Sequence, residues 1–520
     1  MVLDNAKPDA MANNECNCQY CAVKDSIASD KANPNCAVVG VYGHPQASLM
    51  AYYMLHSLQH RGQESTGITT FYECTTLDNK KEMRYVSHHA QGLVLEAFSN
   101  PRIFSHKLIG NMAVGHNRYA TTGANTANNI QPLNMRYHSG ILSVAHNGNL
   151  SNTNTLRRQL QNKGSIFHTS TDTELFLHLI AHSKKNTQIE QIREALSIAK
   201  GAYSLAILTE NALIAARDPH GVRPLSVGRK KLDNGNYAYF VASETCAFDM
   251  IGAEEIRSVM HNEIIVIDDN TIKTGEIKSF KIQEETPIAK HCIFEYIYFA
   301  RPDSRVFGHN VDQVRRKLGK NLALEKPVMP TEDGKKVTVI AVPDSANTAA
   351  LGYARTNQKQ GIDSVFEIGL IRSHYVGRTF IQAGQENREF KVKSKFNPVK
   401  GVIENRNIVV IDDSIVRGTT SKSLVKLLRT ANPAQLHMRI SSPPITSPCH
   451  YGMDFPHKKE LIANSFNNED EIGEALNVDS LHYLSVEKLM ESVPHDEGID
   501  YCTACFTGVY PIELEPELEH

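Results

Sequence analysis

Apolar and polar positions change their pattern abruptly at Cys36. Residues 1–35 are polar, rich in Asn, Asp and Ala, and without periodicity, which predicts an unstructured leader. The run CAVVGVYG that follows is typical of a buried strand, and a Gly-His-Pro turn then leads into a helix expected at about 46–60. Apolar, β-branched runs continue to about residue 285, interrupted by helical patterns at 151–162, 172–183 and 188–199. Strands and helices in separate clusters predict an α+β layered domain over 36–285.

A second pattern begins near residue 286, where each strand is followed by a helix. KVTVIAVPDSANTAALGYA is typical of a strand, a turn and a helix, and NIVVIDDSIVRGTTSKSLVKLLRT repeats this plan. Such units predict a parallel sheet whose ligands lie beyond the carboxyl ends of the strands. We therefore expect an α/β domain over 286–475 that contains a basic, mobile loop at 371–401. A more helical segment with a CxxC is expected over 476–520.

The composition excludes several classes of protein. The 520 residues carry 55 Lys and Arg against 57 Asp and Glu, and the net charge of −2 argues against a nucleic-acid binder. No apolar run reaches the roughly 18 residues that a membrane span needs. Residues 1–35 have neither the apolar core of a secretory signal nor the arginines of a transit peptide. We therefore expect a cytoplasmic protein with no membrane partner and with reduced cysteines.

A candidate phosphate site follows the strand expected at 407–411. Asp412 and Asp413 end this strand, and a loop rich in hydroxyl groups, with Arg417 and Gly418, leads into the next helix. Backbone N–H groups and hydroxyls at a helix start hold phosphates, whereas paired carboxylates bind sugar hydroxyls or Mg²⁺. A buried strand with an Asp as helix cap is the structural alternative, but it does not explain two acids beside this loop. The loop is not a Walker A motif, because GxxxxGK[ST] is absent.

The segment VVIDDSIVRGTTS resembles the phosphoribosylpyrophosphate (PRPP) motif of type I phosphoribosyltransferases, in the version found in amidophosphoribosyltransferases. The resemblance implies that the two aspartates hold the ribose hydroxyls and one Mg²⁺, while the VPDSA loop holds pyrophosphate, with its serine near the metal. IRSHYVGRTFI resembles the family's flexible catalytic loop, but Arg-Ser-His-Tyr stands at 372–375 where the family usually has Lys-Asn-Arg-Tyr. The residues assigned to PRPP in this way are Ser345, Arg372, Tyr375, Arg378, Asp412, Asp413, Ser414, Arg417, Gly418, Thr419 and Thr420. Those assigned to Mg²⁺ are Ser345, Asp412 and Asp413.

Cys36 is a candidate nucleophile if cleavage after Asn35 frees its α-amino group. A free α-amine has a pKa of about 7.7–8.0, which suits a base that takes the thiol proton. From the residues alone, a buried structural cysteine is the more common case at the start of a strand. However, residues 36–68 resemble the opening of the N-terminal nucleophile (Ntn) glutaminases. The motifs GHNRYATTG, AHNGNL and STDTE follow in the family's order.

This second resemblance assigns roles in the first domain and implies an αββα sandwich. The nucleophile is Cys36, and Asn147 with Gly148 supplies neutral donors for a developing oxyanion. The charged groups of glutamine are expected to be held, or their pocket shaped, by Arg61, Arg118 and Asp172. One departure is Ala37, where the family usually has Gly; its methyl group could hamper close approach by the substrate.

The CxxC at 502–505 is by itself open to zinc, redox and cluster roles. Together with SETCAFDMIGA and SPCHYGMD, it resembles the iron–sulfur branch of the family. The resemblance implies a [4Fe–4S] cluster, structural rather than catalytic, with the ligands Cys246, Cys449, Cys502 and Cys505. Cys74 and Cys292 match no motif and are expected in the core. The CxCxxC at 16–21 receives no role, and the histidines show no metal-ligand spacing.

The resemblance covers about 36–515 and implies a glutamine-dependent amidophosphoribosyltransferase. Ammonia released at Cys36 would displace pyrophosphate from PRPP and give phosphoribosylamine, the first step of purine biosynthesis. We expect the ammonia to move through an apolar passage formed when the 371–401 loop closes. A homotetramer and inhibition by purine nucleotides are also implied.

Three alternatives differ in the features that they need. A sugar-isomerase aminotransferase would lack the aspartate pair and the phosphate loop. A non-enzymatic PRPP-sensing regulator would need neither Cys36 nor AHNGN. An ammonia-only transferase would result if the leader were never cleaved.

Overall fold

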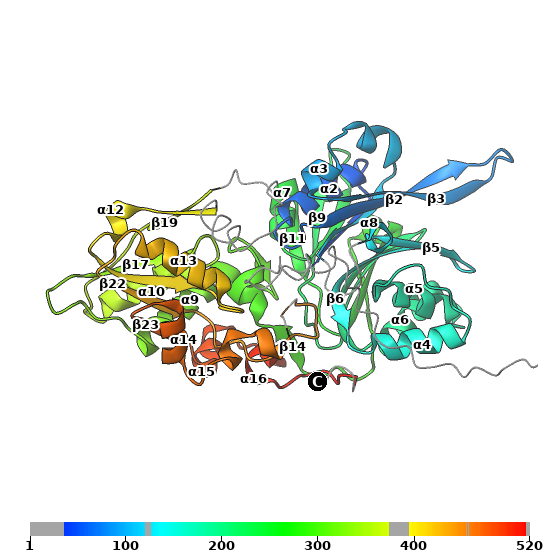
Figure 1. Cartoon of the computed structure of the whole chain (residues 1–520). Coiled ribbons are helices and arrows are strands. Elements are labelled where there is room, and N and C mark those ends of the chain that lie inside the picture. The colour runs from blue at the N-terminus through cyan, green and yellow to red at the C-terminus, as the bar shows by residue number, and fades with distance from the viewer. Residues whose placement is uncertain (1–35, 120–125, 374–394, 454, 456, 516–520) are drawn as a thin grey trace, which may run out of the picture.

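The computed structural model describes residues 36–119, 126–373, 395–453, 455 and 457–515, and the predicted leader lies outside this part. The first half of the chain forms a sandwich of two sheets, and the second half forms a parallel sheet with helices on both faces (Figure 1). Within the described residues, no helix combines the length and the apolar character that a membrane crossing requires.

The first sheet of the sandwich has seven antiparallel strands, and its side chains alternate between two covered faces. In β1 (Ala37–Tyr42), Val38 faces the second sheet, whereas Val39 packs against α2 (Ala47–Ser57) and α7 (Cys246–Ile251). All of β1 is therefore buried. The strand order is β11 (Glu254–Ser258), β9 (Ser226–Lys231), β10 (Tyr237–Ala242), β1, β4 (Met112–Arg118), β2 (Ser65–Thr75) and β3 (Lys81–Gln91).

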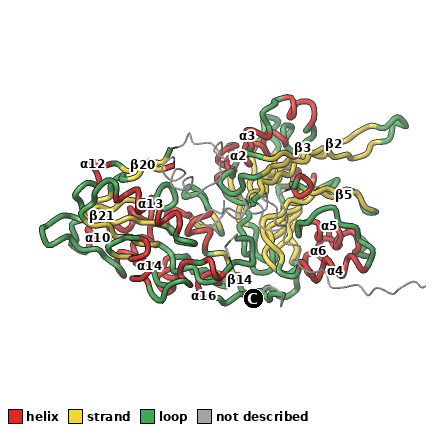
Figure 2. Tube along the Cα trace, in the orientation of Figure 1, coloured by secondary structure: helices red, strands yellow, loops and turns green. Residues whose placement is uncertain are grey.

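The second sheet packs on the first and carries the other helical layer (Figure 2). Ala206 and Leu208 contribute to the core between the sheets, while Leu205 and Ile207 belong to the core beneath the helices. The predicted αββα fold class is thus confirmed. The strand order is β13 (Lys278–Lys281), β12 (Glu263–Asp268), β8 (Ala212–Arg217), β7 (Gly201–Leu208), β6 (Gly140–Leu150) and β5 (Leu133–Tyr137), and the covering helices are α4 (Thr153–Asn162), α5 (Thr173–His182) and α6 (Gln188–Ile198).

Short elements join these layers and lead into the second half. They are α3 (Val94–Ala97), the π-helix η1 (Ile103–Lys107), the 3₁₀ helix η2 (Ala127–Asn129), α8 (Asp269–Thr274), β14 (Ala289–Cys292), the π-helix η3 (Glu295–Phe299), β15 (Arg305–Val306) and β16 (His309–Asn310).

The second half is built on five parallel strands, which confirms the predicted α/β class. Apolar residues of β17 and β21 belong to cores on both faces of the sheet, which explains the continuous apolar run Ile408–Ile411 in β21. The strand order is β18 (Ser364–Phe366), β17 (Val337–Ala341), β21 (Asn407–Asp412), β22 (Gln435–Ile440) and β23 (Ser480–Tyr483). The helices and remaining elements are α9 (Val311–Glu325), α10 (Asn347–Lys359), β19 (Leu370–Arg372), β20 (Phe396–Pro398), α12 (Lys400–Ile403), α13 (Thr419–Arg429), η4 (Lys458–Glu460), η5 (Ile462–Asn464) and α14 (Glu469–Leu476).

The C-terminal segment is less helical than the sequence predicts. It contains α15 (Val486–Ser492) and α16 (Ala504–Thr507), but β23 extends the parallel sheet beyond residue 475. A further strand, β24 (Ile499–Cys502), pairs in parallel with β14 between the two halves (Figure 1). The end of the chain therefore returns to the point where the second half begins.

Candidate active sites and a cysteine group

Cys36 immediately precedes β1 and is buried, with Sγ 3.6 Å from the carbonyl oxygen of Tyr119. Burial raises the pKa of its thiol to about 11, against the opposing effects of the Tyr119 carbonyl contact and Arg118. The thiol is therefore protonated at neutral pH and needs a base to become a nucleophile. The methyl group of Ala37 packs in the core with α2, so this departure from the family pattern is accommodated inside the sandwich.

Asn147 and Gly148 lie on β6, in the second sheet. His116 of β4 lies opposite Val38 in the β1 register, and its Nε2 is 3.0 Å from the carbonyl oxygen of His146, which ties β6 to this region. Both polar side-chain atoms of Asn147 are buried without a hydrogen-bond partner among the described residues. Such an unsatisfied amide requires an explanation, and a donor reserved for a substrate oxyanion provides one.

Gly148 has φ +150°, and a Cβ at this position would lie 2.0 Å from the carbonyl oxygen of Ala202. No other residue fits there without a shift of β7.

Arg118 and Asp172 are buried charges of opposite sign that act on Cys36. Arg118 ends β4, and Asp172 immediately precedes α5. Burial by itself raises the pKa of Asp172, but the His146 ring and hydrogen bonds from the Leu150 N–H and the Thr171 hydroxyl outweigh burial and lower it. The carboxylate is therefore ionised, and the pair suits a zwitterionic substrate such as an amino acid.

Arg61 contacts the backbone of Cys36, and its guanidinium is fully engaged by protein groups. Its Nε donates to the carbonyl oxygen of Cys36 at 3.3 Å, and the terminal nitrogens donate to Glu244 at 2.5 Å and to Glu295 at 2.6 and 2.9 Å. The sequence allowed Arg61 either to hold glutamine or to shape its pocket, and these contacts favour the second role. The sequence carries no local signal for Glu244 or Glu295 as partners of Arg61, because they lie 183 and 234 residues away in the chain.

Asp412 and Asp413 lie at the carboxyl end of β21, beside the loop that follows β17. Both are buried, and the hydroxyl of Ser345 donates to the Asp413 carboxylate across these neighbouring loops. The Asp413 N–H donates to Asp412 at 2.9 Å, and the Ser414 hydroxyl donates to Asp413 at 2.7 Å. These oxygen donors are the ligands that Mg²⁺ prefers. Asp344, in the loop after β17, contacts Arg372 of β19 at 2.7 Å.

Gly418 immediately precedes α13 with φ +79°, so its backbone conformation favours glycine. A Cβ at this position would lie 2.3 Å from Ile462 Cδ1, which shows how closely η5 packs on the loop. Thr419 and Thr420 form the first turn of α13, whose backbone N–H groups suit a phosphate. Tyr375 and Arg378 lie outside the described residues, as does most of the predicted mobile loop.

The structure brings together Cys292, Cys449, Cys502 and Cys505, which we call the cysteine group. Cys292 lies opposite Cys502 in the register of β14 and β24, and burial raises its pKa to about 11. The thiols of Cys502 and Cys505 also have raised pKa values, first through burial and then through the neighbouring cysteines. All four side chains pack in or against one apolar core.

The predicted cluster ligand Cys246 is not part of this group. It begins α7 and packs in the core of the sandwich, where burial raises its pKa to about 12. The fourth cysteine near the C-terminal CxxC is instead Cys292, for which the sequence predicted only a core position. The error arose because parallel pairing between β14 and β24 has no local sequence signal. Cys74, also predicted in the core, is only half-buried on β2.

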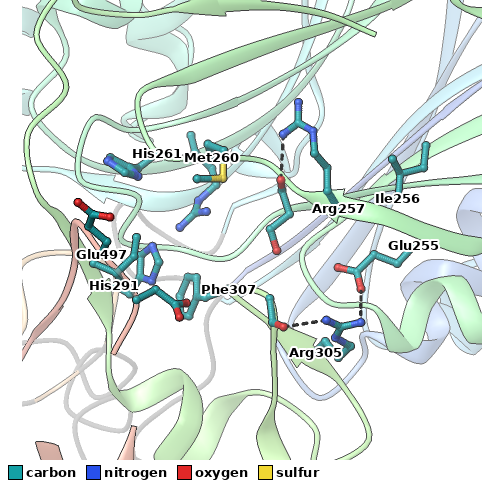
Figure 3. Close-up of a pocket in the computed structure, with 14 residues that line it drawn as sticks. Glu255, Ile256, Arg257, Met260, His261, His291, Arg305, Phe307 and Glu497 are labelled. Atoms are coloured by element: carbon teal, nitrogen blue, oxygen red, sulfur yellow. Dashed lines mark hydrogen bonds and ion pairs between the residues drawn. The ribbon is translucent and has the colours of Figure 1, made fainter. Parts of the chain in front are cut away.

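A pocket of about 460 Å³ lies between the two halves and contains none of the predicted site residues (Figure 3). His291 of β14 stacks on Phe307 there, with ring centroids 4.1 Å apart. Two arginines of the pocket form ion pairs with acids: Arg257 contacts Glu263 at 2.7 Å, and Arg305 contacts Glu255 of β11 at 3.6 Å. The pocket therefore offers little uncompensated charge at these positions.

Comparisons with known proteins cover both halves of the chain. A family model described as a glutamine amidotransferase domain matches residues 116–250. The chain is 46% identical over 484 residues to amidophosphoribosyltransferase 1, chloroplastic, of Arabidopsis thaliana, an alignment that covers 93% of this chain and 80% of that protein. It is 45% identical over 486 residues to the amidophosphoribosyltransferase of Bacillus subtilis (strain 168), covering 93% and 95% respectively.

Two solved structures share the architecture of the whole chain. One is described as the structure of the allosteric regulatory enzyme of purine biosynthesis; it is 45% identical with a TM-score of 0.81, covering 93% of this chain and 97% of that one. The other is glutamine PRPP amidotransferase from B. subtilis complexed with ADP and GMP; it is 44% identical with a TM-score of 0.80, covering 93% and 99%. The similarity therefore extends through both candidate sites.

Proposed function

The chain belongs to the amidophosphoribosyltransferase family, and we propose that it works through a glutaminase site at Cys36 and a PRPP site at the loop after β21. Its reaction is glutamine-dependent amination of PRPP, the first step of purine biosynthesis. The observation that carries the assignment of sites is the presence of two separate buried centres. One contains the buried Cys36 thiol with the oppositely charged Arg118 and Asp172, and the other contains paired aspartates before a helix N-terminus.

At the glutaminase site, Cys36 Sγ attacks the side-chain amide carbon of glutamine. The tetrahedral oxyanion accepts hydrogen bonds from Asn147 and the Gly148 N–H, and its collapse gives a thioester and ammonia. Water then hydrolyses the thioester to glutamate and restores the thiol. The base is the α-amino group of Cys36, freed by cleavage after Asn35, because a thiol with a pKa of about 11 does not ionise unaided at neutral pH.

At the PRPP site, the first turn of α13 and the hydroxyls of Ser414, Thr419 and Thr420 hold the 5′-phosphate. Asp412 and Asp413 bind the ribose hydroxyls. Ammonia attacks C1, the bond from C1 to the pyrophosphate oxygen breaks, and a proton leaves the new amine. Mg²⁺, held by the aspartates and Ser345, would supply positive charge for the departing pyrophosphate.

The cysteine group fits a [4Fe–4S] cluster. Four thiols from three segments meet beside an apolar core, a donor set typical of such clusters. In the described part of the chain, no three His, Cys, Asp or Glu side chains are arranged to bind a single metal ion. A cluster bound by the cysteine group would hold β14 and β24 to the loop around Cys449.

The oligomeric state, the cellular location and the regulation are inferred from membership of the family. We propose a homotetramer that works in the cytosol and is regulated by purine nucleotides. The B. subtilis relative crystallised with ADP and GMP supports the last point.

The test of the two-site assignment is Cys36→Ala. This variant should lose glutamine-dependent turnover and retain turnover with ammonium salts, since the second site is intact. Equal loss of both activities, or persistence of glutamine-dependent turnover, would contradict the assignment.

A further inference from the structure

An unbroken line of buried polar contacts joins the nucleophile to the cysteine group. Arg61 donates to the carbonyl oxygen of Cys36 and, through Nη2, to Glu295 Oε1 at 2.6 Å. The same carboxylate oxygen accepts from Arg223 Nη1 at 3.3 Å. Arg223 Nη1 is also 3.7 Å from Cys292 Sγ. One oxygen atom of Glu295 is thus shared by the arginine under Cys36 and the arginine beside the cysteine group.

Arg223 contacts this group from two directions. Besides Cys292, its Nε and Nη2 donate to the carbonyl oxygen of Tyr451 at 3.1 and 2.9 Å. The Tyr451 N–H in turn donates to Cys449 Sγ at 3.4 Å. A displacement of Cys292 or Cys449 would therefore change the contacts of the Arg223 guanidinium.

The charges on this line are buried and have little freedom to move independently. The side chains of Arg61, Arg223 and Glu295 are fully buried. Burial lowers the pKa of Arg61, but Glu295 and Glu244 outweigh burial and raise it. Leaving a buried guanidinium without its carboxylate partner costs much free energy. Arg61 and Arg223 therefore keep their contacts with Glu295 when it moves.

Glu244, the other carboxylate on Arg61, makes its further contacts elsewhere. It accepts from His60 at 2.7 Å, from the Ser304 hydroxyl at 2.7 Å and from the Arg301 N–H at 2.9 Å. Glu295 alone among the Arg61 carboxylates reaches Arg223 in the described structure.

We propose that Glu295 is a positioning residue that makes the geometry of Cys36 depend on the cysteine group. The inference rests on the proposed role of Cys36 as the glutaminase nucleophile. With the cysteine group intact, Arg223 holds Glu295, Glu295 holds Arg61, and Arg61 fixes the Cys36 carbonyl so that Sγ faces the substrate. Glutamine hydrolysis therefore depends on this line, whereas the use of free ammonia at the second site does not.

The primary test is Glu295→Gln in the full-length holoenzyme, which removes the charge and keeps the shape. Alkylation of Cys36 by a diazoketone analogue of glutamine should slow by about 10- to 100-fold, as expected for a misplaced nucleophile. The ratio of glutamine- to ammonia-dependent turnover should fall by a similar factor. Glu263→Gln is the matched control, because it breaks a carboxylate–arginine pair of the same sandwich that does not touch this line. An alkylation rate of Glu295→Gln equal to that of the control would overturn the proposal.

A double-mutant cycle tests the path to the cysteine group. Arg223→Lys should slow alkylation by itself and add little in the Glu295→Gln background, because both changes interrupt one line. Additive effects would show that Arg223 does not act through Glu295. If Glu295→Gln does not fold, Glu295→Asp provides the same cycle with a shortened carboxylate. Cys36→Ala is assayed in parallel: if it keeps glutamine-dependent turnover, the nucleophile assignment fails, independently of how Glu295 behaves.

Discussion

Cys292 lies directly opposite Cys502 in the parallel pairing of β14 with β24. This contact joins the start of the second half to the end of the described chain, and Arg223 Nη1 lies 3.7 Å from the Cys292 thiol. The cysteine group is thus built where the sandwich, the parallel sheet and the C-terminal segment meet. A cofactor bound there would hold all three together.

The first prediction separates Cys292 from Cys246 as a cluster ligand. Anaerobically purified protein should be brown and contain about four iron and four sulfide per chain. Cys292→Ser should lose most of the iron and the visible absorbance, whereas Cys246→Ser should retain both, since Cys246 packs in another core. Stoichiometric zinc in the parent protein would contradict the cluster, and retention of iron by Cys292→Ser would contradict the ligand set.

The second prediction concerns the N-terminus of the active protein. Intact-mass measurement should show a chain that begins at Cys36, because only then does an α-amino group lie beside the thiol. Full glutamine-dependent activity with residues 1–35 retained would contradict this.

The third prediction follows from the raised pKa of Cys36. In a chain that retains the leader, the thiolate is the minor form below the thiol pKa of about 11. Alkylation of Cys36 by iodoacetamide should therefore accelerate by about tenfold for each pH unit between pH 7 and 10. The cleaved chain should react with a flatter pH dependence, because its α-amine takes the thiol proton near pH 8. The two profiles are compared by mass spectrometry of the modified peptide; identical profiles would argue against the amine as base.

The fourth prediction tests the unsatisfied amide of Asn147. Asn147→Ala should lower the glutamine-dependent kcat by about 100- to 1,000-fold, as the loss of one oxyanion donor does. Turnover with ammonia should stay near the parent value. A drop in both activities would instead indicate a structural role for this residue.

The fifth prediction compares two glycines in the second half. Gly418 has φ +79° and meets Ile462, whereas Gly361 has φ +80° with nothing within 4 Å of a built Cβ. Alanine at either position should cost about 1–3 kcal/mol of stability from backbone strain. Only Gly418→Ala should also raise the KM for PRPP, because it displaces the loop before α13. Equal KM values in the two variants would exclude the phosphate role of this loop.

Local patterns in the sequence predicted the elements that surround both candidate sites. The apolar run after Cys36 is buried on both faces of β1, and the strand, aspartate pair, glycine loop and helix at 407–430 appear as β21 and α13. These features are encoded by neighbours in the chain, whose backbone preferences and hydrophobic periodicity act within a few residues.

Only the tertiary structure decided which distant residues meet. It excluded Cys246 from the cysteine group and added Cys292, and it placed Arg61 between Glu244 and Glu295, 183 and 234 residues away in the chain. Such contacts depend on how the two halves pack, and no local spacing records that packing. The sequence by itself determined the fold class and the motifs of both sites, and the packing of the two halves determined the line of charges between Cys36 and the cysteine group.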